Sequence, residues 1–430
     1  MTGIGVAAIS YFQFERSNPT LQRKVFSTAL VAVFLNAILT VTPLILMSRS
    51  LSNVLFNDPN YSSAVILISL LVPIELLYQL VLTTYQAQLN SFKYLIVCAI
   101  RTTACVLITS VLVLYLNLGF FGILISMLSH TALATLPFVF LILRNAQWSI
   151  DIVVWWNLLK FGAPFVPGGI FLFILNSADR YFLSRLCGPS SVGIYSLGYK
   201  LGSVLPLLLL GPFMKVWSAI MIDTVNSKNG RRTIALSATY FAFAYLFAAV
   251  ILSLLSPALL RAMAPSSYAA AAQVVPIVAL SYLFYSLSVI FDTVFYAKKR
   301  THIKPVLLAA SSLFSLPCYL ILIRSHGSLG AATATLLGFL FHAIITAVAA
   351  NKYLMVPYEI GRLLRLCLAA VSSYILLRAI FPSAAPSTSI ISSLLGFVTF
   401  PLLTLVFFCW TRREIYAFLS LVKQKLDVLQ

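Results

Sequence analysis

The chain has 430 residues, of which 61% are hydrophobic and only 9% are charged, and its mean hydropathy is +0.99. Ordinary soluble domains carry roughly 25% charged residues, so these values exclude a water-soluble fold and predict an all-α polytopic membrane protein. The 29 Lys and Arg residues outnumber the 10 Asp and Glu residues, which gives a net charge of +19. Most of this excess lies in short gaps between apolar stretches, where it faces lipid headgroups, and it does not indicate nucleic-acid binding.

Twelve apolar stretches are each long enough to cross a bilayer core of about 30 Å as a helix. They cover residues of about 25–47, 63–86, 94–116, 119–143, 162–186, 190–216, 233–256, 270–296, 305–324, 327–350, 363–381 and 388–409. An apolar stub over residues 1–14 precedes them and is too short to cross.

The distribution of positive charge predicts the orientation. Placing the loop over residues 144–160 in the cytoplasm leaves most Lys and Arg residues inside by alternation, and the C-terminus is then cytoplasmic. The longest outer loops are expected at about 48–62 and 257–269. Residues 151–160, which combine two tryptophans with aliphatic side chains, and the basic stretch 412–429 are expected to lie on the inner membrane surface.

The two halves of the chain repeat the same short patterns in the same order. The matches are Tyr85 and Lys93 with Tyr296 and Lys304 (211 positions apart), Gly119-x-x-Gly122 with Gly327-x-x-Gly330 (208 apart), and Tyr61 with Tyr268 (207 apart). Repeats of this kind are typical of transporters that alternate access to a site at the repeat interface. At this offset the counterparts of 162–186 and of most of 190–216 would precede residue 1, so the architecture predicts about 45–50 further residues there.

The repeat also predicts the domain organisation, which is two pseudo-symmetric helical bundles plus two C-terminal helices, with about 12–13 transmembrane segments. The expected parts are an N-terminal bundle (1–145), an interfacial linker helix (146–160), a C-terminal bundle (161–352), two additional transmembrane helices (353–410) and a basic cytoplasmic tail (411–430).

The stretch between residues 161 and 201 carries the most specific motifs. It contains Phe161-Gly162-Ala163-Pro164, then Asp179-Arg180-Tyr181-Phe182, then Val192-Gly193-Ile194-Tyr195-Ser196 followed by Tyr199-Lys200. These motifs resemble the signature of the polysaccharide biosynthesis (O-antigen and exopolysaccharide) flippases of the multidrug/oligosaccharidyl-lipid/polysaccharide exporter superfamily. The resemblance covers nearly the whole chain, from inside the family's second helix to its fourteenth, and only the family's first helix has no counterpart.

The resemblance implies a transporter of the bacterial inner membrane that moves undecaprenyl-pyrophosphate-linked oligosaccharides to the periplasmic leaflet by alternating access. The implied pathway is O-antigen lipopolysaccharide, capsule or exopolysaccharide biosynthesis. The implied partners are membrane lipids and the polysaccharide polymerase and glycosyltransferases of the same pathway. No cofactor is implied, and coupling to Na⁺ or H⁺ would supply the driving force.

Several polar side chains fall inside the predicted spans, where burying a charge costs at least ~2.5–3.5 kcal/mol. Asn176, Asp179 and Arg180 form one stripe, and Lys200 belongs to a second stripe on the next helix. A pyrophosphate needs cationic donors, so Arg180, Lys200, Arg101 and Asn176 are the candidate substrate-binding residues. The alternatives are that Asp179 and Arg180 tie helices together, or that the cations reach the membrane interface.

Three acidic residues inside the spans are candidates for a second role. Asp179, Glu75 and Asp292 are expected to bind a coupling ion or to form internal ion pairs, with Arg101 or another base as the partner of Glu75.

Other function classes stay open. A drug or cation antiporter of the same superfamily would favour a net acidic cleft, and a lipid II flippase would share the mechanism. A membrane polysaccharide polymerase or ligase would need a sizeable outer loop with catalytic residues. The sequence carries no P-loop, GxSxG or HExxH motif and no CxxC or Cys/His cluster, so we expect no enzyme activity, no catalytic residue and no metal site.

Overall fold

A computed structural model describes residues 28, 30–31, 35, 38–56, 58–87, 90–144, 156, 165–298, 300–382 and 386–410. These residues form helices joined by short turns, and no strand occurs among them. The chain divides into two compact units, residues 1–169 and 170–430. The expected linker helix over 146–160, apart from Trp156, and the expected tail over 411–430 lie outside the described residues.

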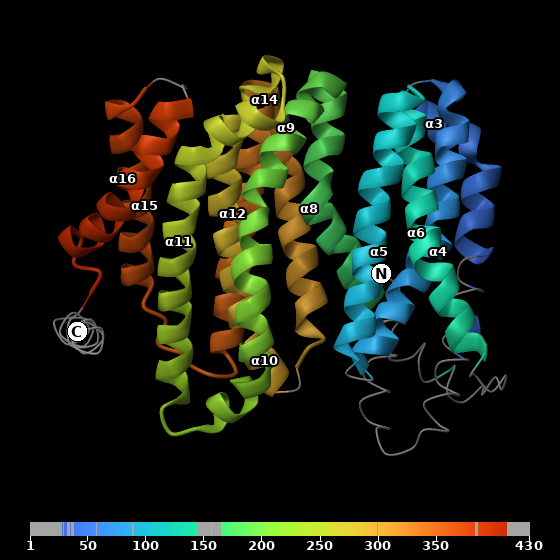
Figure 1. The fold of residues 1–430 in the computed structure, drawn as a ribbon. Helices are drawn as coiled ribbons and strands as arrows, with labels where there is room; N and C mark the ends of the chain where they lie inside the picture. The colour runs from blue at the N-terminus through green and yellow to red at the C-terminus, as the bar shows by residue number, and fades with distance from the viewer. Residues whose placement is uncertain are drawn as a thin grey trace, which may run out of the picture. The chain divides into compact units, whose positions relative to one another are not determined.

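The first unit is built from a small set of helices (Figure 1). They are α3 (Ser48–Phe56), α4 (Ser62–Ala87), α5 (Ser91–Ser110) and α6 (Gly119–Arg144), with a 3₁₀ turn η1 (Pro59–Tyr61) before α4 and a π-helical turn η2 (Val111–Tyr115) after α5. Helix α6 packs against both α4 and α5.

The second unit contains the rest of the chain, except that its first helix begins just before the unit boundary. Its elements are α8 (Phe165–Cys187), α9 (Pro189–Gly202), η3 (Pro206–Leu210), α10 (Gly211–Asn226), α11 (Gly230–Met263), η4 (Ser266–Tyr268), α12 (Ala271–Phe291), α13 (Thr293–Ala297), α14 (Ile303–Asn351), α15 (Ile360–Ile380) and α16 (Pro386–Val406). Helix α12 packs against α9, α11 and α14, and it is the most buried of these segments.

Nine helices in the described part of the chain are long and apolar enough to cross a membrane, or ten if the bent pair 38–46 and 48–56 forms one span. Helix α14 counts once among them but contains two spans. Gly327 has non-helical angles (φ 54°, ψ −126°) inside it, and Phe314 stacks on Phe341 with ring centroids 4.4 Å apart. A hydrogen bond of 2.9 Å joins Ser311 and His342. The two segments are therefore antiparallel, as the predicted spans 305–324 and 327–350 require.

Both of the expected outer loops, at about 48–62 and 257–269, contain less loop than the sequence predicts. Residues 48–56 form helix α3, which meets the helical segment 38–46 at an angle of 71°. Helix α11 continues to Met263 and so includes half of the second expected loop. Serines and an asparagine in the first segment, and Pro257 in the second, suggest loops in the sequence. A proline inside a helix of this length removes one backbone donor, and the packed helix tolerates that loss.

The two units repeat the same glycine turns. Gly119, the first residue of α6, has φ 52°, and Gly327, at the centre of α14, has φ 54°. Only glycine adopts this left-handed region without strain. The second glycine of each pattern packs against the preceding helix: a Cβ on Gly122 would lie 3.2 Å from the Leu112 carbonyl oxygen, and one on Gly330 would lie 1.9 Å from that of Leu322.

The tyrosines and lysines of the repeat also occupy matching places. Lys93 Nζ lies 5.8 Å from the ring centroid of Tyr85, and Lys304 Nζ lies 5.6 Å from that of Tyr296. The short 3₁₀ turns η1 and η4 end at the matching tyrosines of the two halves. The structure thus confirms the internal repeat predicted from the sequence.

Helix α9 packs against α12 through two glycines that are four residues apart. A Cβ on Gly198 would lie 2.5 Å from the Ala271 carbonyl oxygen, and one on Gly202 would lie 2.8 Å from a methyl group of Val278. Small residues at this spacing let two membrane helices approach closely. The close approach brings the tyrosines of α9 to the side chains of α12.

Replacing Gly198 by alanine is expected to lower the stability of the folded protein by about 1–3 kcal/mol, because the added methyl group overpacks the contact with α12. The matched control is Gly193→Ala on the same helix, where a Cβ meets only the Tyr268 side chain at an ordinary 3.6 Å. The measurement is the thermal unfolding midpoint of the purified protein in detergent. Equal midpoints for the two variants would contradict the close approach.

The additional helices α15 and α16 pack against α11 (Figure 1). Glu359, just before α15, links α15 to α11. Its carboxylate accepts hydrogen bonds from Thr239 (2.9 Å) on α11 and from Arg362 (3.0 Å) on α15. Arg362 is only 6% exposed, and its guanidinium carbon lies 5.0 Å from the centre of a Trp410 ring. A buried arginine needs such a partner, so this contact fastens the C-terminal pair to the second unit.

Candidate functional site

Four acidic side chains in the described part of the chain each pair with a basic side chain. The pairs are Glu75 with Arg101, Asp179 with Arg180, Asp292 with Lys304 and Glu359 with Arg362, at N···O distances of 2.7, 3.1, 2.7 and 3.0 Å. The Asp179 pair belongs to the most extensive polar network among them, and it lies in the segment that carries the sequence motifs.

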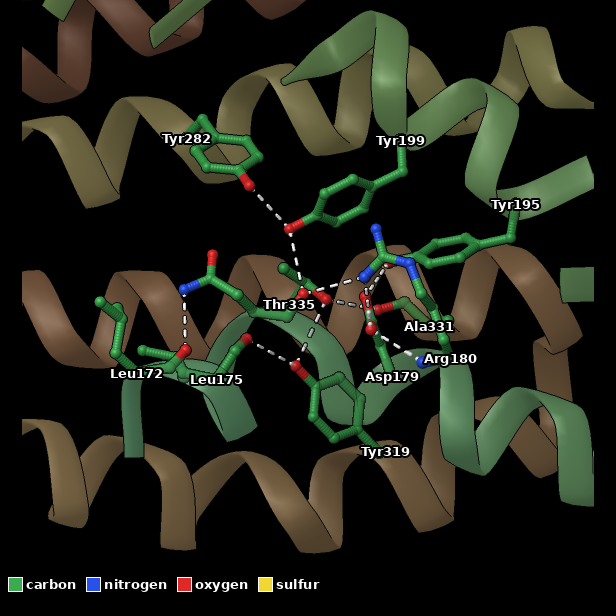
Figure 2. A network of polar contacts seen from close by, with 11 residues as sticks. Leu172, Leu175, Asp179, Arg180, Tyr195, Tyr199, Tyr282, Tyr319, Ala331 and Thr335 are labelled. Carbon is green, nitrogen blue, oxygen red and sulfur yellow. Dashed lines mark hydrogen bonds and ion pairs between the residues drawn. The ribbon is translucent and has the colours of Figure 1, made fainter. Parts of the chain in front are cut away.

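Asp179 is fully buried and both of its carboxylate oxygens are bound (Figure 2). One oxygen accepts the hydroxyl of Tyr195 on α9. The other accepts the backbone N–H of Arg180 (2.8 Å) and its guanidinium Nη1 (3.1 Å). A buried carboxylate is stable only when charge and hydrogen bonds compensate it, and here three donors do so.

Arg180 is oriented by this carboxylate and by an aromatic ring. Its Nη1 also donates to the Asn176 carbonyl oxygen (2.9 Å), and its guanidinium carbon lies 4.1 Å from the ring centroid of Tyr199. Among the described residues, Nε and Nη2 of this guanidinium have no hydrogen-bond partner, and 30% of the side chain is exposed. Arg180 is therefore a fixed cation with two donors left to bind an anion.

Two tyrosines close the network from α9 and α12. The hydroxyls of Tyr199 and Tyr282 lie 2.8 Å apart, and the Tyr199 hydroxyl also lies 3.5 Å from the Asn176 carbonyl oxygen. Figure 2 shows Tyr199 between Tyr282 and the guanidinium. The sequence does not predict that the hydroxyls of Tyr195, Tyr199 and Tyr282 belong to the site. The first two are four residues apart on one helical face, but their partners are distant in the sequence.

Asn176 lies half-buried one turn before Arg180. Its Nδ2 donates to the Leu172 carbonyl oxygen at 2.8 Å on the same helix, so the amide group is engaged by its own backbone. Its backbone carbonyl oxygen, and not its side chain, binds Arg180.

Lys200 follows Tyr199 on α9 but points elsewhere, because successive residues of a helix are about 100° apart. Its side chain is exposed, and within the described ranges no side chain pairs with its ammonium group. It lies outside the Arg180 network and remains a separate cation.

Glu75 and Arg101 join α4 to α5 in the first unit. The contact is bidentate, with Nη1 to Oε1 at 3.1 Å and Nη2 to Oε2 at 2.7 Å, and the guanidinium carbon lies 4.1 Å from the ring centroid of Tyr78. Both side chains are about one third exposed (27% and 36%). Both terminal nitrogens of Arg101 are thus bound to a carboxylate, whereas Nη2 of Arg180 remains available.

The balance of charge in the described part of the chain is positive. Four of its six acidic residues are paired as above, Asp58 caps η1 by accepting the Asn60 backbone N–H, and Asp223 is exposed on α10. No three His, Cys, Asp or Glu side chains of these residues gather as a metal site, and the six cysteines are unpaired.

Comparison with known proteins supplies the family and the fold. The model of the polysaccharide biosynthesis protein family matches residues 1–222. No curated protein sequence matches the chain.

Solved transporter structures match the chain in fold. The structure of the lipid II flippase MurJ in an inward closed conformation is 15% identical, with a TM-score of 0.75 over 96% of this chain and 90% of that one. An inward-facing multidrug resistance MATE family transporter is 13% identical, with a TM-score of 0.67 over 82% and 86%. A MOP superfamily transporter from Pyrococcus furiosus is 13% identical, with a TM-score of 0.58 over 82% and 83%. The chain therefore belongs to the polysaccharide biosynthesis protein family, and its fold is that of the membrane transporters of the MOP superfamily.

Proposed function

We propose that the protein is a flippase that moves oligosaccharide units linked to undecaprenyl pyrophosphate across the bacterial inner membrane. The observation that carries the proposal is the charge balance of the described helices. Four of the six acidic residues in the described part of the chain are paired with bases, while Arg180 keeps two donors and Lys200 stays unpaired. Such a protein has cationic groups to offer an anionic cargo.

The chemistry of the cargo fits these groups. A pyrophosphate carries roughly two negative charges at neutral pH, and it is the part of a lipid-linked sugar that most opposes entry into the bilayer. An arginine held in one orientation can bind two of its oxygens at once. In this proposal Asp179 and Tyr199 hold the guanidinium, and Nε and Nη2 bind the phosphate.

Alternating access would then carry the bound headgroup from one side to the other, while the lipid tail stays in the bilayer. The proposed orientation places the C-terminus and the basic turns in the cytoplasm. Coupling to H⁺ or Na⁺, and supply and use of the cargo by glycosyltransferases and a polymerase, are parts of the same proposal.

A lipid II flippase is the second candidate, and the match to MurJ over 96% of the chain favours it. Lipid II also contains a polyprenyl pyrophosphate, so the Arg180 site would serve either cargo, and the two differ only in the sugar. A cation antiporter is less well supported, because it would need an acidic side chain free to bind the cation, whereas the internal acids described here are paired.

The test is flipping of fluorescent undecaprenyl-pyrophosphate oligosaccharide in proteoliposomes, with fluorescent lipid II in a parallel set. Lys200→Ala is expected to slow flipping by about tenfold, since one charge-assisted contact contributes about 1.5 kcal/mol or more. Lys215→Ala, which removes an exposed lysine of α10, is the matched control and should leave the rate unchanged.

Each outcome of this assay assigns the cargo. Faster movement of the oligosaccharide lipid supports the polysaccharide pathway, and faster movement of lipid II supports the second candidate. Correctly folded protein that moves neither lipid would contradict the proposal.

A further inference from the structure

The acid–base pair at the joint between α12 and α13 is unequally buried. Asp292 lies at that joint with only 3% of its side chain exposed, and its Oδ2 lies 2.7 Å from Nζ of Lys304. Lys304, near the start of α14, is 34% exposed. The acid is thus enclosed in the protein, while about one third of the side chain of its base is exposed.

Lys304 is the only basic partner of Asp292 among the described residues. Its ammonium group also lies 3.4 Å from the Tyr296 hydroxyl. The other ionisable side chains near enough to interact with this pair are Tyr285 on α12, Tyr358 before α15 and His342 on α14. His342 is occupied by a 2.9 Å hydrogen bond to Ser311, so it does not replace Lys304 as a partner.

The turn beside this pair is strongly basic. Lys298 and Arg300 lie between α13 and α14, and both are exposed. With Lys304 they place three positive charges within seven residues, and Tyr296 adds an exposed hydroxyl. Clusters of this kind attract the phosphates of lipid headgroups.

The internal repeat shows that the fold does not need the acid. In the first unit, Lys93 lies over Tyr85 as Lys304 lies over Tyr296. The residue that matches Asp292 at the same offset of 211 is Val81, which is fully buried. A carboxylate therefore lies beside only one of the two equivalent lysine–tyrosine pairs, which points to a role in function.

We propose that Lys304 and the basic turn form a second phosphate-headgroup site, and that a phosphate oxygen replaces the Asp292 carboxylate as the partner of Lys304. Lys304 keeps its proton and its positive charge throughout. Asp292 takes up one proton from solvent as its ammonium partner leaves, so that binding of one headgroup is coupled to uptake of one proton. This inference rests on the proposed function and names its coupling ion.

The physical reason for the proton is the burial of Asp292. An unpaired carboxylate enclosed in a protein is strongly destabilised, and it becomes neutral by binding a proton. Linkage then requires that headgroup binding favours protonation and that low pH favours headgroup binding. The affinity for the headgroup should therefore fall about tenfold for each unit of pH increase, over the pH range in which binding takes up one proton.

The test is calorimetric titration of the purified full chain in phosphatidylcholine nanodiscs with farnesyl pyrophosphate. Measuring the heat in two buffers of different ionisation enthalpy gives the number of protons taken up. Asp292→Asn is the key variant: it should bind the ligand at least as tightly and take up about one proton fewer than the unaltered protein. Because protons bound by the ligand itself appear in both titrations, the difference reports Asp292.

Lys93→Gln is the matched control, since it alters the equivalent lysine without an acid beneath it, and its proton uptake should equal that of the unaltered protein. A second arm adds phosphatidylglycerol to the nanodiscs. Proton uptake caused by this lipid alone would assign the site to a phospholipid headgroup, and uptake only with farnesyl pyrophosphate would assign it to the cargo.

Two results would overturn the inference. Binding of farnesyl pyrophosphate with equal proton uptake in the unaltered protein and in Asp292→Asn would refute the exchange while leaving the proposed function intact. No binding of farnesyl pyrophosphate to folded protein would contradict both.

Discussion

Replacing Arg180 by alanine is expected to lower the initial rate of flipping of an undecaprenyl-pyrophosphate oligosaccharide by about ten- to hundredfold. The variant removes two free donors and their charge. The loss of even one hydrogen bond to a charged group costs about 1.5–3 kcal/mol, which is a factor of about ten to a hundred because every 1.4 kcal/mol is tenfold. Arg180→Lys should recover part of the rate, because it keeps the charge but loses the planar fork that binds two oxygens.

The matched control for this prediction lies on the same helix. Arg185 is exposed near the end of α8, with its guanidinium carbon 5.7 Å from the ring centroid of Tyr181. Arg185→Ala removes the same side chain five residues away and should flip at the unaltered rate. A loss of rate that is equal in both variants would show that total charge matters and that the Arg180 site does not.

Replacing Asp179 by alanine is expected to destabilise the protein by about 3 kcal/mol, the lower end of the cost of breaking a buried ion pair, because the remaining partner Arg180 is 30% exposed. Arg180 would lose its countercharge, and the fully buried Tyr195 hydroxyl would lose its acceptor. Asp179→Asn keeps one acceptor oxygen and should cost less. The measurement is the thermal midpoint and the yield of monodisperse protein in detergent.

A double variant separates charge from packing in this prediction. Asp179→Leu combined with Arg180→Leu removes both charges together and should recover much of the stability, because apolar pairs often replace buried ion pairs at little cost. Asp223→Ala, at an exposed carboxylate of α10, serves as the control and should unfold at the unaltered temperature. If Asp179→Ala unfolded at the same temperature as Asp223→Ala, the Asp179 carboxylate would have no structural role.

Much of the fold follows from hydropathy alone. A helix covers most of every predicted span from 63–86 onward, since about 20 apolar residues in a row can cross a bilayer only as a helix. The predicted outer loop at 48–62 was wrong because Arg49 and three serines lower the hydropathy of α3. Ser52 is nevertheless buried, and its hydroxyl donates to the Asp58 carbonyl oxygen at 2.5 Å, which satisfies a polar group that hydropathy counts as exposed.

Less of the candidate site follows from the sequence. Asp179 and Arg180 are adjacent in the chain, so the sequence already suggests that they pair. The structure adds that this pair leaves two arginine donors open. The contact of Tyr199 with Tyr282 spans 83 residues, and no local pattern in one sequence predicts which distant helices touch. Lys304 lies twelve residues after Asp292, and only the structure shows that the two side chains are paired.

The glycine turn inside α14 has a consequence for how the chain enters the membrane. Because Gly327 reverses the chain directly between the two helical segments of α14, only a few residues around Arg324 and His326 have to pass to the far side. Two apolar spans joined so tightly can insert together as a helical hairpin during synthesis, with no long polar segment to translocate. Gly119 provides the same tight reversal at the start of α6, so both units are suited to assembly from preformed hairpins at the translocon.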